Sequence, residues 1–114
     1  MSTTQAKRAW FLPQKTLAAG AIGAAYMGVG TALEQAPRQT FIQNLTDATL
    51  QFSFDGVNDH FPLPPNGFYL NDITSNKSED GGFFLSKGDR LYVKTISAPT
   101  TGIVYFSIMY GKAD

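Results

Sequence analysis

The residues best suited to chemistry in this 114-residue chain are clustered between Asp55 and His60, in the sequence Asp-Gly-Val-Asn-Asp-His. Carboxylate and amide oxygens could bind Ca²⁺, but the alternating oxygen ligands, central glycine and closing acid of a calcium loop are absent. A zinc site would need further nitrogen or sulfur ligands, and the chain has one histidine and no cysteine. We therefore expect no metal and no cofactor. A turn whose Asp and Asn side chains cap backbone amides is the favoured interpretation, with a bound ion as the alternative.

Covalent and acid–base catalysis also find little support in the sequence. A serine hydrolase needs a nucleophile beside a base, yet His60 is the only imidazole and no Gly-x-Ser-x-Gly motif is present. Two carboxylate pairs exist, Asp55 with Asp59 and Glu79 with Asp80, but nothing predicts the burial that acid catalysis requires. We expect a protein that is not an enzyme.

The aromatic residues allow two interpretations. Nine phenylalanines and five tyrosines could form a stacking platform for sugars or nucleic acid, with Phe68, Tyr69 and Phe83 as candidates for a binding face. The simpler interpretation is that they fill a small core. Asn44 and Asn76 each begin an Asn-x-Ser/Thr pattern, which arises by chance and gains no support from a secretory signal.

The elements that must position these residues are predicted to be β-strands. Leu50, Phe52 and Phe54 alternate with polar residues, which is the period of two expected of a half-buried strand. Turn-forming residues precede this segment. Residues 40–45 and 48–54 are therefore predicted to form a hairpin.

The rest of the chain after residue 54 continues the strand pattern. Residues 60–67 contain three prolines and predict an edge strand or a rim loop. Residues 103–110, apolar on both faces except for Ser107, predict a strand that lies in the middle of a sheet or is covered on its second side. Further predictions are strands at residues 68–73, 83–85 and 90–97, the last paired with 103–110, and a polar loop at 74–82. With turns roughly every 8–12 residues and no convincing helix, the pattern indicates a sandwich, barrel or jelly roll.

An N-terminal arm is predicted to precede this body. The residue before Pro37 is pushed out of helical geometry, which divides an arm at residues 1–36 from a body at residues 37–114. Residues 17–33 are uncharged, but the run is short and mostly Ala and Gly, so a structural role is favoured over a membrane helix or a signal sequence. Residues 25–31 are predicted to be a Gly-rich first strand or part of the extended arm, with glycines that let another backbone come close.

Composition and charge point to contacts with other proteins. Charged residues make up 16% of the chain, below the roughly 25% of an ordinary domain, and a chain of this size forms a marginal core that neighbours would stabilise. The net charge of zero divides into +3 over residues 1–38 and −3 over residues 39–114. An acidic body argues against binding along a nucleic-acid backbone, and a basic arm could pair with an acidic neighbour.

The arm also contains candidate anchor residues. Large apolar side chains in a segment with little to bury them could insert into a partner, since such residues dominate contact energies. The alternative is that they fold back onto their own domain. The predicted partner-binding residues are Trp10, Phe11, Leu12, Lys7, Arg8 and Lys15.

Several short segments resemble small virion structural proteins of tailed bacteriophages. The likeness covers about residues 25–111. Its motifs are Y-x-x-V-G-T (26–31), FIQNLTDA (41–48), FSFDGVNDH (52–60), DITSNK (72–77), RLYVK (90–94) and APTTG (98–102). The resemblance implies an all-β head decoration or cement protein that binds the outside of an assembled capsid. Its implied partners are the major capsid protein or other virion subunits and further copies of itself, with neither nucleic acid nor membrane.

Sequence and resemblance together predict the following protein. It is all-β, a single β-sandwich or jelly-roll-like domain of about eight strands with an extended N-terminal arm. It is made in the host cytoplasm and resides in the virion, on the capsid exterior or at the head–tail junction. The alternatives are a portal, neck or tail adaptor or collar component, and a host-surface carbohydrate-binding module.

Overall fold

The computed structural model of the chain describes residues 7–72, 85 and 87–113. These residues form nine β-strands and one short 3-10 helix, Ala19–Ala21, so the predicted all-β class is confirmed. No helix in this part of the chain is long and apolar enough to cross a membrane. The strands are β1 Lys7–Phe11, β2 Lys15–Ala18, β3 Met27–Gly28, β4 Gln39–Thr46, β5 Leu50–Ser53, β6 Phe61–Leu63, β7 Phe68–Asp72, β8 Tyr92–Thr95 and β9 Gly102–Ala113.

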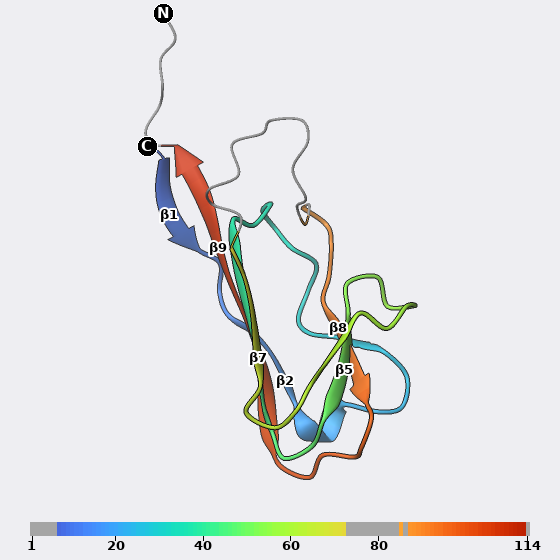
Figure 1. The fold of residues 1–114 in the computed structure, drawn as a ribbon. Helices are drawn as coiled ribbons and strands as arrows, with labels where there is room; N and C mark the ends of the chain where they lie inside the picture. The colour runs from blue at the N-terminus through green and yellow to red at the C-terminus, as the bar shows by residue number, and fades with distance from the viewer. Residues whose placement is uncertain (1–6, 73–84, 86, 114) are drawn as a thin grey trace, which may run out of the picture.

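The strands form two antiparallel sheets (Figure 1). The larger sheet has the order β1-β9-β4-β7, with β2 also paired to β9, and the smaller sheet has the order β3-β8-β5-β6. The pairing is nested along the chain: β1 and β2 pair with β9, β3 with β8, β4 with β7, and β5 with β6. Pairs β4–β9 and β5–β8 join these into the two sheets. Among the described strands, β5 and β6 are therefore the only partners that follow one another in sequence.

One buried core lies between the two sheets. Ile42, Val104 and Phe106 enter it from the larger sheet, and Phe52 and Val93 enter it from the smaller sheet. Full burial of a side chain of this kind is worth about 1.5–3 kcal/mol. β9 has partners on both sides, as its apolar sequence on both faces predicted.

Two predicted strand pairings are wrong. Residues 40–45 and 48–54 contain strands, but β4 belongs to the larger sheet and β5 to the smaller. The same separation applies to β8 and β9, which were predicted to pair. In both places the chain crosses from one sheet to the other. A turn sequence marks where the chain changes direction, and it does not specify whether the next strand joins the same sheet.

Asn44 stabilises the crossing from β4 to β5. Its side chain is fully buried, and its amide nitrogen donates to the carbonyl oxygens of Ala48 (2.9 Å), Leu63 (2.9 Å) and Pro64 (3.2 Å). Its side-chain oxygen accepts from the backbone N–H (3.0 Å) and the hydroxyl (2.6 Å) of Thr46. One side chain thus joins the end of β4 to the crossing and to the smaller sheet. The same burial keeps the Asn-x-Thr pattern at Asn44 away from solvent in the folded chain.

Asp47 connects this crossing to the one between β8 and β9. Its Oδ1 accepts from the backbone N–H groups of Thr100 (2.8 Å) and Thr101 (3.2 Å), and the Thr100 hydroxyl donates to Oδ2. The Thr100 hydroxyl, followed by the two backbone N–H groups, lowers the pKa of Asp47 to about 2. The two crossings therefore lie side by side at one end of the molecule.

The residues assigned to an arm are extended, but from Lys7 to Ala18 they lie on the larger sheet of their own chain. β1 and β2 both pair antiparallel with β9, with Phe11 opposite Met109 and Thr16 opposite Tyr105. The physical reason is that β9 would otherwise present a row of unpaired backbone groups along this edge. The strand predicted at residues 25–31 is reduced to β3.

The glycines near β3 make room for side chains. A Cβ atom built on Gly28 would lie 2.2 Å from the Arg90 guanidinium carbon, and one built on Gly30 would lie 2.7 Å from the Cβ of Lys15. Arg90 Nε also donates to the carbonyl oxygen of Gly30 at 2.7 Å. The space that the missing Cβ atoms leave is thus filled by two long basic side chains.

The predictions for the sheet edges have mixed outcomes. β6 is the edge strand of the smaller sheet, as the three prolines in residues 60–67 predicted, and β7 forms an edge of the larger sheet. The loop predicted at residues 74–82 lies outside the described residues. The strand predicted at residues 83–85 does so as well, except for Leu85, which packs against the core.

Candidate interaction surface

The larger sheet has a weakly charged stretch, between Phe11 and Leu45, on the face that points away from the core. Strand pairing places its outward residues in rows that cross the sheet. From the β1 end to the crossing end, these rows are Phe11, Met109, Gln39 and Asp72; Ser107, Phe41 and Leu70; Thr16, Tyr105, Gln43 and Phe68; and Ala18, Ile103 and Leu45. We call this set of residues the outer face. Asp72 is the only charged residue within it.

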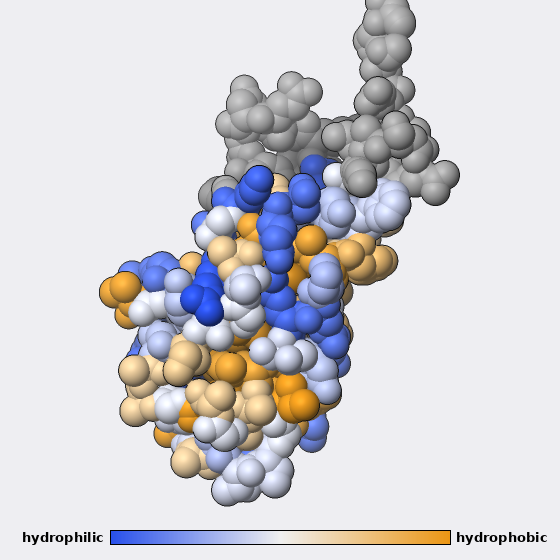
Figure 2. Space-filling view, turned by 180° about the vertical axis from the view of Figure 1, so that it is seen from behind, coloured by the Kyte–Doolittle hydropathy of each residue, from blue (hydrophilic) through white to orange (hydrophobic). Residues whose placement is uncertain are grey.

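Large apolar side chains of the outer face are open to solvent. Phe11 is 69% exposed, Phe68 62%, Leu70 51% and Leu45 41%. Val57, Ile96 and Met27 are exposed outside the outer face. Figure 2 shows hydrophobic and hydrophilic residues interspersed on one side of the molecule. Contiguous apolar patches mark contact sites, and the centres of protein interfaces are rich in aromatic residues and Met and poor in charge. The outer face has the composition of a surface that another macromolecule covers.

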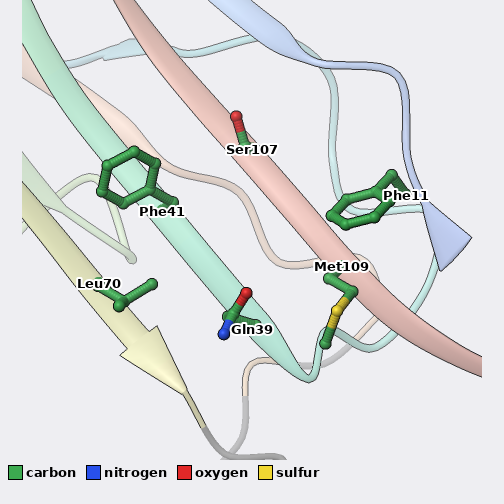
Figure 3. Close-up of a pocket in the computed structure, with 6 residues that line it drawn as sticks. All are labelled: Phe11, Gln39, Phe41, Leu70, Ser107 and Met109. Atoms are coloured by element: carbon green, nitrogen blue, oxygen red, sulfur yellow. The ribbon is translucent and has the colours of Figure 1, made fainter. Parts of the chain in front are cut away.

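The outer face contains a hollow of about 350 Å³ (Figure 3). Its residues come from β1, β4, β7 and β9, and Figure 3 shows their side chains on one side of the sheet. One of its two polar residues, Ser107, already accepts a hydrogen bond from the side-chain amide of Gln14 (3.1 Å). We call this hollow the pocket, and it is lined by Phe11, Phe41, Leu70, Met109, Gln39 and Ser107. A mainly apolar pocket suits an aromatic or aliphatic side chain.

The predicted anchor residues lie in different environments. Phe11 belongs to the outer face and lines the pocket, whereas Trp10, 43% exposed, alternates to the opposite side of β1. Leu12 is half-buried and packs against the core. The backbones of Lys7 and Arg8 lie in β1. Of the apolar anchors, only Phe11 is brought to the outer face.

Lys15 does not fit its predicted role as a partner-binding residue. It is 6% exposed, and its Nζ lies 3.0 Å from both Thr31 Oγ1 and Glu34 Oε1. The Lys15 ammonium is the largest cause of the lowered pKa of Glu34. Because a buried charge needs partners, this basic residue of the arm pairs with the acidic residue of the same arm. The Lys15 side chain therefore stabilises its own chain through its contacts with Thr31 and Glu34.

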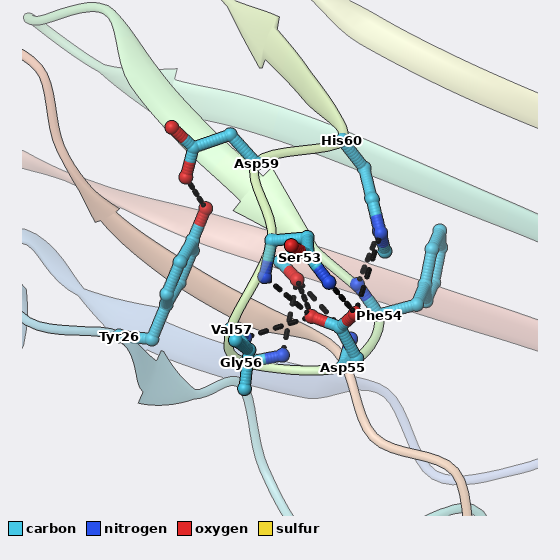
Figure 4. Close-up of polar contacts among 9 residues, drawn as sticks. Tyr26, Ser53, Phe54, Asp55, Gly56, Val57, Asp59 and His60 are labelled. Carbon is cyan, nitrogen blue, oxygen red and sulfur yellow. Dashed lines mark hydrogen bonds and ion pairs between the residues drawn. The ribbon is translucent and has the colours of Figure 1, made fainter.

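The segment from Asp55 to His60 is a capped turn, as predicted (Figure 4). Asp55 Oδ1 accepts from the backbone N–H groups of Val57 (2.7 Å) and Asn58 (2.8 Å), and the bonds from Asn58 and Val57 hold the pKa of Asp55 well below its usual range. His60 Nδ1 accepts from the backbone N–H of Phe54 (3.0 Å). The imidazole and this carboxylate are thus used to fix the turn.

Asp59 connects the turn to the rest of the smaller sheet. The Tyr26 hydroxyl donates to Asp59 Oδ1 (2.5 Å), and Lys94 Nζ lies 3.1 Å from the same oxygen (Figure 4 shows the first contact). Burial, followed by the bond to Asp59, raises the pKa of Tyr26, while the Tyr26 hydroxyl and then Lys94 lower the pKa of Asp59.

Within the described residues, no three His, Cys, Asp or Glu side chains are grouped to hold a metal.

The aromatic residues proposed for a sugar-binding face are not brought together. Phe68 lies on the outer face with its ring centroid 5.6 Å from that of Phe41. Tyr69 projects to the other side of β7, where its ring centroid lies 4.7 Å from that of Phe61 in the smaller sheet. Phe83 lies outside the described residues. Phe68 and Tyr69 therefore cannot form one stacking platform.

No protein-family model, curated protein or solved structure matches this chain. The features of the chain that bear on function are therefore the outer face, the fold and the resemblance of the short segments.

Sequence reasoning missed most of the pocket. Phe41, Leu70 and Met109 were assigned to strands but to no site. A signal was present, because residues 39–46 and 95–111 contain no charged residue. What brings these uncharged segments together is the pairing of β4 with β7 and β9, which links residues far apart in the chain.

Proposed function

We propose that the chain is a non-enzymatic structural protein of a tailed-bacteriophage virion, built into the particle through contacts between subunits. The outer face is the observation that carries this proposal, since it combines one charge, exposed aromatic residues and an apolar pocket. Such a face is unfavourable in water and becomes stabilising when another subunit covers it. The segments that resemble virion proteins favour a phage particle as the assembly in which this face is covered.

We infer further that the two sheets form a jelly-roll sandwich. The nested pairing supports this class, because the first strand pairs with the last and each later strand with the next one inward. If β1 and β2 are taken as one interrupted strand along β9, eight strands form two sheets of four. Jelly rolls occur in viral capsid domains and in lectins, so the fold adds an analogy and no proof of function.

In the proposed role the protein decorates or cements the outside of the capsid. Its partners are the major capsid protein or other virion subunits, and its core gains stability from them. A portal, neck or tail position would use the same surface chemistry. The two positions differ in the number of copies that a particle holds.

Copy number therefore tests the proposal. Quantitative mass spectrometry of purified particles of the phage that encodes the chain, with the major capsid protein as internal standard, should find on the order of hundreds of copies, because shell symmetry repeats each site. About a dozen copies would instead assign the protein to the neck or tail, where ring symmetry is low. Particles that lack the chain altogether would overturn the proposal.

A further inference from the structure

We propose that the partner on the outer face is a second copy of this chain, docked face to face so that Phe68 of each copy enters the pocket of the other. This inference rests on the proposed function only in requiring that the outer face be covered in the assembled state.

The outer face carries both a projecting side chain and a recess that could receive it. Phe68 is 62% exposed and lies two residues from Leu70, which lines the pocket. Its ring centroid lies 5.6 Å from that of Phe41, another lining residue. A two-fold axis between the projection and the recess would insert each Phe68 into the partner's pocket, which is the reciprocal contact of a symmetric dimer.

The size of the pocket suits this side chain. Its volume is about 350 Å³, and four of its six lining residues are apolar. A closed apolar cavity of about 150 Å³ is enough to bind benzene. A phenylalanine ring therefore fits with room for the lining side chains to adjust.

The charge of the outer face also favours a second copy. A charged partner surface would lose its hydration against the rows of the outer face, which contain no basic residue; Lys7, paired with Ala113, lies two rows beyond Phe11. The one acidic residue of the outer face, Asp72, lies in an end row, beside Gln39. Two outer faces can thus meet without a central like-charge contact, and an uncharged surface of matching extent is present on the chain itself.

The outer face has the size of a small interface, since its projected area is about half of the roughly 800 Å² of accessible surface that a standard interface buries per partner. At about 4.8 Å between strands and about 3.3 Å per residue, four strands and seven residues span roughly 19 by 23 Å, or about 400 Å² in projection. The exposed aromatic side chains project from the sheet, so the accessible surface of the outer face is larger than this flat projected area. A standard interface buries about 800 Å² of accessible surface per partner, and sheets pack face to face at about 10 Å.

The first test is the oligomeric state of the full-length chain. Sedimentation velocity over a concentration series should show a dimer for the wild type. Phe68→Lys and Leu70→Glu should each weaken dimerisation by roughly 100-fold, since each places a charge at the centre of the contact. The matched control is Val57→Lys, at a position 78% exposed in the turn of the smaller sheet, which should leave the dimer unchanged. Circular dichroism should show that all variants keep the fold, because the substituted side chains are exposed.

The second test uses the reciprocity of the contact. In a mixture of Phe68→Lys and Leu70→Glu, the new lysine enters the pocket that holds the new glutamate, while the other contact of the same heterodimer stays wild-type. The mixture should therefore dimerise although neither variant does so alone. A mixture that stays monomeric would overturn the assignment of Phe68 to the partner's pocket.

A wild-type chain that is monomeric at about 100 µM, where a stable homodimer would be populated, would overturn the proposal. If Phe68→Lys were then also missing from particles, the outer face would belong to a shell subunit, and the proposed virion function would stand. Absence of the wild-type chain from particles, by contrast, would remove the proposed function and leave the dimer result unaffected.

Discussion

Asn44→Ala is expected to lower the free energy of unfolding by roughly 4 kcal/mol, a large share of the stability of a small domain. The substitution removes the donor to the carbonyl oxygens of Ala48, Leu63 and Pro64 and the acceptor for two groups of Thr46. Asn44 is fully buried, so water cannot replace these bonds without opening the core. Each buried polar group left without a partner costs about 1–3 kcal/mol.

Urea unfolding followed by tryptophan fluorescence measures this effect. Gln43→Ala is the matched control, because it removes the neighbouring amide side chain on the outer face and should cost less than about 1 kcal/mol. A variant too unstable to titrate would be compared by its melting temperature, which should fall well below that of the control. If Asn44→Ala and Gln43→Ala unfolded alike, the crossing between the sheets would not depend on Asn44.

Gly102→Ala is expected to lower the free energy of unfolding by roughly 3 kcal/mol. Gly102 begins β9 with a φ of 101°, and a Cβ atom built there would lie 2.1 Å from the carbonyl oxygen of Leu45 and 2.6 Å from the Cα of Thr46. Backbone atoms of β4 cannot move aside without breaking the pairing of β4 with β9. The alanine variant therefore combines a strained backbone with a close contact.

Gly88→Ala separates these two causes. Gly88 has a similar φ of 98°, but a Cβ atom there would have no atom within 4 Å. Gly88→Ala should therefore lower the free energy of unfolding only by the cost of backbone strain, about 1–2 kcal/mol. If urea unfolding showed the same loss of stability for both variants, the close approach of β4 to Gly102 would contribute nothing to the effect of Gly102→Ala.

The positions of the strands could be predicted from the sequence to a large extent, whereas their partners could not. The alternation around Phe52, the prolines of residues 60–67 and the apolar last strand each reflect the surroundings of one segment, and the structure agrees with them. The exception is Ser53, which the alternation placed toward solvent and which is fully buried. Pairing in this fold is nested, so most partners are far apart in the chain. Turn residues before β5 and β9 predicted hairpins, although the chain crosses between sheets at both places.

The candidate surface was predictable only in part, for the same reason. Phe11 was noted because an aromatic residue in a polar segment is conspicuous on its own. Leu70 and Met109 become neighbours only through β4, which separates β7 from β9. Lys15 shows the opposite case, since its charge suggested a partner while the fold supplies Glu34 of the same chain.

The central claim is that the outer face is covered in the assembled particle, and hydroxyl-radical footprinting of side chains tests it most directly. Phe11, Phe68 and Met109 would be followed by mass spectrometry in purified particles and in the isolated chain at a dilution where it is monomeric. Met27, 47% exposed on the smaller sheet, gives the rate of an uncovered methionine in the isolated chain. We expect the oxidation rates of the three outer-face residues to fall by at least about fivefold in particles, as burial at an interface core requires. Equal rates in particles and in the isolated chain would contradict the claim.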